Sequence, residues 1–157
     1  MHLSRKGAVS LLTVLILLVF GFTNITFAQD IILKDLESQP VNLSHYKGNP
    51  AIFFFWTTWC PYCRKEMKTL NQMYPQMKKE GIALFGVNVG ELDYKVVKFI
   101  KDNAISFRVL LDRNSAAAYD YEVIGVPTYI LLDKAGRVIM QGNSLPVDYK
   151  DLLKNNL

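Results

Sequence analysis

The stretch FWTTWCPYC, residues 55–63, contains both cysteines of a 157-residue chain. The run before them, NPAIFFFW (49–56), is continuously apolar, as in strands that are buried on both faces of a sheet. After them, apolar residues recur at helical spacing within residues 61–81, and Pro61 suits a first helical turn because its missing N–H would have no partner there. The sequence therefore predicts a strand, a short loop and a helix that begins between the two cysteines.

Strands and helices alternate over the rest of the chain, which predicts an α/β fold with a central mixed sheet and helices on both faces. The length favours one domain, residues 29–157, and residues 30–48 predict an N-terminal β-hairpin extension or an extended lead-in. Asn114 or Ser115 is the expected cap of the third helix. The expected strands are 82–90, 107–112, 127–133 and 137–142, the last two forming a hairpin, and the later helices are 92–104, 114–123 and 147–157.

Residues 1–28 have the layout of a secretory signal peptide. Arg5 and Lys6 are followed by the apolar run 8–22 and by small residues before a cleavage point after Ala28. The run has about 15 residues, fewer than the roughly 20 of a spanning helix, and retention as an N-terminal membrane anchor is the alternative. In either case the remainder is exported, to the periplasm or the outer face of the cytoplasmic membrane.

The charge of the chain gives no argument for binding nucleic acid. The formal net charge of +4 falls to +2 without the cations Arg5 and Lys6, since no other charged residue precedes Asp30. The lysines within residues 67–80 are typical of the solvated face of a helix. Half of the residues are hydrophobic, which is enough for a packed core.

The position of Cys60 and Cys63 favours redox chemistry. A helix N-terminus stabilises a thiolate, which is the reactive form of cysteine. The spacing of three residues places both sulfurs on one helical face, and export places them where exchange with protein disulfides is useful. Cys60, at the helix end beside Trp59, is the expected attacking residue, and Cys63, one turn further on, is the expected resolving residue.

Two other uses of the cysteines are weaker. Structural zinc needs four ligands, and only His2 and His45 could supplement the cysteines. A purely structural disulfide across so small a loop would remove little chain entropy. No metal and no cofactor are therefore expected.

At this point the chain resembles the thioredoxin-fold proteins, and specifically the membrane-side thioredoxins of the TlpA and ResA type. The thioredoxin-like motifs are WCPYC (59–63) after AIFFFW and GVPTYILLD (125–133) about 65 residues on. The more specific similarity lies in VNLSHYKGNPAIFFFWTTWCPYCRKEM (41–67), GVNVGE (86–91) and VPTYILLDKAGRVI (126–139). The resemblance implies a thioredoxin-like fold over most of the exported chain.

The resemblance also implies roles for single residues. Pro127 matches the family's cis-proline, which would hold the Val126 backbone against a substrate strand. Glu66 and Glu91 match acids near the pair, where a carboxylate could take the proton of the buried thiol. The alternative for Pro127 is an ordinary strand-edge proline. Glu66 could instead be a solvated helix residue, and Glu91 an acid at the start of a helix. The implied substrate-contacting residues are Trp59, Pro61, Tyr62, Val126 and Pro127, with simple rim packing as the alternative for Trp59.

The implied activity is that of an extracytoplasmic disulfide reductase, and several relatives act in cytochrome c maturation. Its partners would be an oxidised substrate protein and a membrane-embedded thiol donor, and the chain is expected to be a monomer.

Departures from the family leave alternatives open. Phe54 stands where thioredoxin carries a buried aspartate, so that a proton relay would have to use Glu66 or Glu91. The dipeptide Pro61–Tyr62 is typical of glutaredoxins, although their glycine-rich glutathione motif is absent, and this dipeptide affects the reduction potential. A net oxidant or isomerase is therefore a second hypothesis. A peroxidase would need a proline that FFFWTTWC lacks, and a non-enzymatic binding module would have no use for the intact cysteines.

Overall fold

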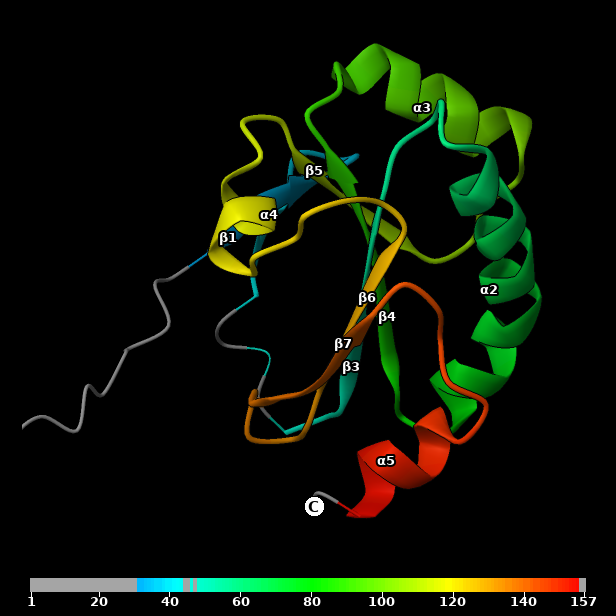
Figure 1. Cartoon of the computed structure of the whole chain (residues 1–157). Helices are drawn as coiled ribbons and strands as arrows, with labels where there is room; N and C mark the ends of the chain where they lie inside the picture. Colours follow the sequence, from blue (N-terminus) through cyan, green and yellow to red (C-terminus); the bar gives the residue numbers. More distant parts are fainter. Residues whose placement is uncertain (1–30, 44–45, 47, 156–157) are drawn as a thin grey trace, which may run out of the picture.

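A computed structural model of the chain describes residues 31–43, 46 and 48–155 (Figure 1). The predicted signal or anchor, residues 1–28, lies outside the described residues, and so do His2 and His45. Across the described ranges, no helix combines the length and the apolar character needed to cross a membrane.

The strands form one mixed sheet, as the alternation of elements predicted. In this sheet the spatial order is β2-β1-β5-β4-β3-β6-β7. The pairs β3–β4 and β4–β5 are parallel, and the other neighbouring pairs are antiparallel. The strands are β1 (Ile32–Asp35), β2 (Pro40–Asn42), β3 (Ala51–Trp56), β4 (Ala83–Val89), β5 (Arg108–Asp112), β6 (Thr128–Leu132) and β7 (Val138–Gly142).

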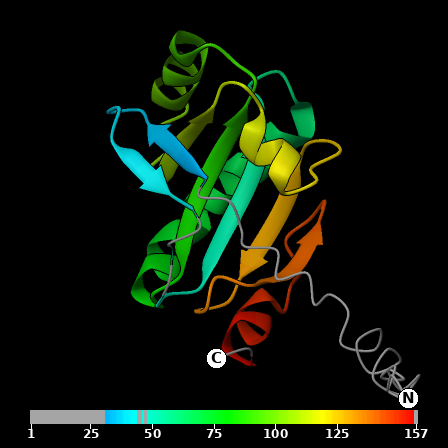
Figure 2. The same ribbon diagram turned by 90° about the vertical axis from the view of Figure 1, so that its left-hand side faces the viewer.

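Helices cover both faces of this sheet, which confirms the predicted layering (Figures 1 and 2). Buried residues of α2, α3 and α5 join one core cluster, and Ala117 and Ala118 of α4 join the other. The helices are α2 (Pro61–Lys79), α3 (Asp93–Asp102), α4 (Ala116–Asp120) and α5 (Tyr149–Asn155).

The central strand β3 explains why the run AIFFFW (51–56) is continuously apolar. All six residues of β3 are buried, because successive side chains point to opposite, covered faces. Phe53 and Phe55 pack with α4, whereas Phe54 and Trp56 pack in the cluster that contains α2. The strand is therefore fixed from both sides up to the residue before the redox loop.

The start of α4 has one of its two predicted cap residues, and a second residue contributes to the capping. Ser115 is the N-cap residue, but its side chain makes no capping hydrogen bond. The Asn114 side chain accepts from the N–H of Ala116 at 3.3 Å. The stronger cap is Asp112, whose buried carboxylate accepts from the N–H groups of Ala117 and Ala118 at 3.2 and 2.9 Å. A carboxylate suits this place because a helix N-terminus leaves amide groups unpaired.

Three segments meet at the edge of the sheet where β3 ends. The last pairs of the register are Trp56 with Asn88 of β4 and Phe55 with Thr128 of β6. The loop before the cysteines, the turn after β4 and the segment before β6 therefore lie at the same edge. The topology thus brings residues near 60, 90 and 126 together.

Candidate active site

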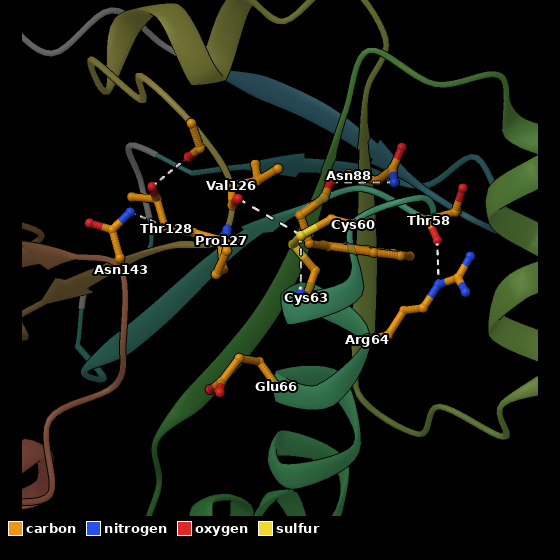
Figure 3. Close-up of a disulfide and its surroundings, with 12 residues drawn as sticks. Thr58, Cys60, Cys63, Arg64, Glu66, Asn88, Val126, Pro127, Thr128 and Asn143 are labelled. Carbon is orange, nitrogen blue, oxygen red and sulfur yellow. Dashed lines mark hydrogen bonds between the residues drawn. A yellow bond between two sulfur atoms is a disulfide. The ribbon is translucent and has the colours of Figure 1, made fainter.

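Cys60 and Cys63 form a disulfide at the N-terminus of α2, with Cα atoms 5.2 Å apart (Figure 3). Cys60 is the N-cap residue, and Pro61 occupies the first helical position as predicted. The backbone N–H of Cys63 lies 3.1 Å from Cys60 Sγ. The helix has no acidic residue in its first turn, so no carboxylate there opposes negative charge on Cys60.

The two cysteines are both buried, Cys63 slightly more deeply than Cys60. The side chain of Cys63 is fully buried, whereas Cys60 keeps 4% of its surface exposed. Trp59 and Tyr62, at 67% and 74% exposure, stand on either side of Cys60 in the sequence. This arrangement fits the predicted roles, with Cys60 reachable by a partner and Cys63 behind it.

The segment before β6 faces the disulfide. The peptide bond between Val126 and Pro127 is cis, as the resemblance implied, and Cys60 Sγ lies 3.8 Å from the Val126 carbonyl oxygen (Figure 3). Two residues that the sequence did not single out support this segment. The Thr128 hydroxyl donates to the Gly125 carbonyl at 2.7 Å, and the Asn143 side chain donates to the Pro127 carbonyl at 3.1 Å.

Glu66 is half-buried and paired rather than solvated. It lies one turn after Cys63 on α2, and its carboxylate accepts a hydrogen bond from the Tyr129 hydroxyl at 2.6 Å. Burial, with Glu66 beside it, raises the pKa of Tyr129, so the hydroxyl remains a donor across the physiological range. The Tyr129 ring packs on Phe54 at 4.9 Å between centroids. A tyrosine–glutamate pair thus lies next to Phe54, which by the resemblance corresponds to thioredoxin's buried aspartate.

Tyr129→Phe tests whether this pair contributes to stability. The substitution keeps the ring and removes the donor, so we expect the free energy of unfolding to fall by about 1.5 kcal/mol at pH 7. Urea denaturation of the oxidised protein measures it. Tyr119→Phe is the matched control, since Tyr119 is 83% exposed and should change by less than about 0.5 kcal/mol. Equal stability of the two variants would contradict the prediction.

Glu91 points to the loop before the cysteines. One carboxylate oxygen accepts from the Thr58 N–H at 2.6 Å and from the Asn88 side chain at 2.7 Å, and the other accepts from the Thr58 hydroxyl at 2.7 Å. Thr58 and Asn88 were not expected as site residues. Thr58 bonds Glu91 across 33 positions and Asn88 contacts the Trp56 carbonyl across 32, and contacts over such separations leave no periodic signal. The predicted role of Glu91 as proton acceptor of Cys63 stays a prediction.

The described residues contain no cluster of three or more His, Cys, Asp or Glu side chains that could hold a metal ion.

The sequence matches the AhpC/TSA family over residues 26–141. The thiol-disulfide oxidoreductase ResA of Geobacillus thermodenitrificans (strain NG80-2) is 36% identical over 130 residues, which cover 82% of this chain and 75% of that protein. ResA of Bacillus subtilis (strain 168) is 32% identical over 132 residues, covering 81% and 74%. The crystal structure of StoA from Bacillus subtilis superimposes with a TM-score of 0.65 at 29% identity, covering 79% of this chain and 93% of that one.

The family match spans more than half of the chain, and the ResA alignments include the redox pair and the cis-proline segment. The fold and the disulfide at the start of α2 agree with both comparisons. The chain therefore belongs to the AhpC/TSA family, within which it is a thiol-disulfide oxidoreductase of the ResA type.

Proposed function

We propose that the protein reduces disulfides of other exported proteins through Cys60 and Cys63. In the reduced form, the Cys60 thiolate attacks one sulfur of the substrate disulfide, and the other substrate sulfur leaves as a thiolate that takes up a proton. Cys63 then loses its proton and attacks Cys60 Sγ, which forms the Cys60–Cys63 disulfide and releases the second substrate thiol. Two electrons pass to the substrate, and a membrane-embedded thiol donor returns them.

The observation that carries this proposal is the position of Cys60 Sγ. It lies at the N-terminus of a 19-residue helix and 3.1 Å from the N–H of Cys63. Both features stabilise a thiolate relative to a thiol, and the thiolate is the nucleophile in exchange. The second sulfur is fully buried, so that it is reached from Cys60 and not from solvent.

The proton of Cys63 needs an acceptor, and Glu66 is the one we propose. It lies on the same helix one turn beyond Cys63 (Figure 3), and the neutral Tyr129 hydroxyl holds its carboxylate in place. Glu91, the other predicted acceptor, directs both oxygens at Thr58 and Asn88.

The substrate would bind across the Cys60 surface. Val126 has its carbonyl oxygen 3.8 Å from Cys60 Sγ, which supports pairing of an extended substrate segment with its backbone. The exposed Trp59 and Tyr62 rings, together with Pro61 and Pro127, would supply apolar contacts to that segment.

The direction of electron flow is tested by the reduction potential. A reductase should equilibrate near about −270 mV, the value of thioredoxin, and a strong oxidant near about −120 mV. The measurement follows the Cys60–Cys63 disulfide after incubation in dithiothreitol or glutathione mixtures of known ratio. A value near that of strong oxidants would favour the net oxidant or isomerase, the alternative raised by Pro61–Tyr62.

The place of action follows from the N-terminal segment. Export through residues 1–28, whether cleaved or retained as an anchor, would put a monomeric domain at the outer face of the cytoplasmic membrane. There it could meet a membrane donor and an oxidised substrate, including an apocytochrome c during cytochrome c maturation.

A further inference from the structure

Thr58 connects the end of β3 to the redox helix, and each of its polar groups has a partner. Its N–H and its hydroxyl donate to the two carboxylate oxygens of Glu91, at 2.6 and 2.7 Å. Its carbonyl oxygen accepts from Arg64 Nε at 2.8 Å (Figure 3). A residue two positions before Cys60 is therefore held from the β4–α3 turn and from the first turns of α2.

Glu91 is itself held in place from the sheet. The Asn88 side chain donates to Glu91 at 2.7 Å and lies 3.5 Å from the carbonyl oxygen of Trp56, the last residue of β3. Three donors thus converge on one carboxylate, and an ionised carboxylate is suited to this because it only accepts hydrogen bonds.

These bonds replace pairing that the sheet no longer supplies. The register of β3 with β4 ends at Trp56 and Asn88. Within residues 57–60, the backbone–backbone hydrogen bonds are a turn contact from the Cys60 N–H to the Thr57 carbonyl at 3.4 Å and the bond from the Arg64 N–H to the Cys60 carbonyl at 3.1 Å. Without Glu91, the middle of the loop that carries Trp59 and Cys60 would keep the bond from Arg64 Nε to the Thr58 carbonyl and lose the bonds that join it to the β4–α3 turn.

We infer that Glu91 and Thr58 are a positioning pair, in which the carboxylate fixes the loop of residues 57–59 and thereby the alignment of Cys60 with Val126. The inference rests on the proposed exchange reaction at Cys60. Exchange requires the attacking sulfur to approach along the axis of the substrate disulfide, and a misplacement of about 1 Å in a reacting group can cost on the order of a hundredfold in rate. Glu91 acts through Thr58, and Glu66 remains the proposed proton acceptor of Cys63.

The two roles for Glu91 separate when Cys63 is absent. In a Cys63→Ser background only the first step, attack by Cys60, takes place, and no Cys63 proton has to be removed. A positioning pair still matters for this step, whereas a proton acceptor for Cys63 does not. We would therefore measure, in full-length chain, the second-order rate constant for reaction of reduced Cys60 with glutathione disulfide.

In this background, Thr58→Val and Glu91→Gln are each expected to slow the first step about tenfold, because each removes at least one hydrogen bond to a charged group. The double variant should be no slower than Glu91→Gln alone, since both act on one unit. Thr58→Ser, which restores the hydroxyl, should recover the rate to within about twofold. Thr69→Val is the matched control. The Thr69 hydroxyl donates to the Lys65 carbonyl on the exposed face of α2 and does not contact Glu91.

Protection of the Thr58 amide against hydrogen exchange gives a second, structural measurement. It should be lost in Glu91→Gln and in Glu91→Asp, whose carboxylate is one methylene shorter, even if Thr58→Val does not fold. An unchanged first step in Glu91→Gln, or full Thr58 amide protection in that variant, would overturn the inference. Failure of the Cys63→Ser parent to form any glutathione adduct would instead count against the proposed function.

Discussion

Cys60→Ser is expected to abolish thiol–disulfide exchange, lowering the rate by at least about a thousandfold. A serine hydroxyl is not ionised near neutral pH and cannot form a mixed disulfide, so no first step occurs. Cys63→Ser is expected to keep the first step and to lose the second, because nothing then attacks the bond between Cys60 and the substrate. This variant should accumulate mixed disulfides with its natural partners.

The measurement is capture of these adducts in cells. Cells that produce Cys63→Ser are treated with acid and an alkylating agent, adducts are separated without reductant, and mass spectrometry identifies the attached proteins. Cys60→Ser, prepared in the same way, is the matched control and should carry none. Adducts on Cys60→Ser but not on Cys63→Ser would reverse the attacking and resolving roles, contrary to the 4% and 0% exposure of the two side chains.

The same variants distinguish enzyme from binding module. If Cys60→Ser combined with Cys63→Ser left the cellular function unchanged, a non-enzymatic role in an envelope assembly would explain it better. Loss of function in the double variant together with adducts on Cys63→Ser supports catalysis through the dithiol.

The sequence was sufficient for the features that depend on local pattern. The continuous apolar run of β3, Pro61 at the first helical position and the spacing of Cys60 and Cys63 each carry their own physical signal. The cis peptide bond before Pro127 was implied by the resemblance. The order and direction of the strands explain why this segment and Cys60 lie at the same edge of the sheet.

The partners of the acidic residues could not be predicted in this way. Glu66 bonds Tyr129 across 63 positions, and Glu91 bonds Thr58 across 33. Neither hydrogen bond affects the spacing of apolar residues along the sequence. Each pairing can therefore be recognised only once the folded chain shows which strands and loops lie side by side. The sequence predicted Asn114 or Ser115 as the cap of α4, and Ser115 is the N-cap residue. The added contribution of Asp112 was not predicted, because this residue ends β5 and reaches past residues 113–115 to the helix.

Asp112→Ala is expected to lower the free energy of unfolding by about 2–4 kcal/mol. The fully buried carboxylate accepts the N–H groups of Ala117 and Ala118, and the substitution leaves two buried donors without an acceptor. Asp112→Asn keeps one acceptor oxygen but turns an amide N–H₂ toward a second donor, so a smaller loss of about 1–2 kcal/mol is expected. Urea denaturation of the oxidised protein measures both values.

Asp120→Ala is the matched control, since Asp120 is an exposed acid on the same helix and should change stability by less than about 0.5 kcal/mol. If Asp112→Ala were as stable as this control, the capping role would be wrong. The loss should also extend to the redox site, because α4 leads through residues 121–125 to Val126, whose carbonyl faces Cys60. We therefore expect Asp112→Ala to exchange disulfides more slowly even under conditions where it remains folded, whereas Asp120→Ala keeps the parent rate.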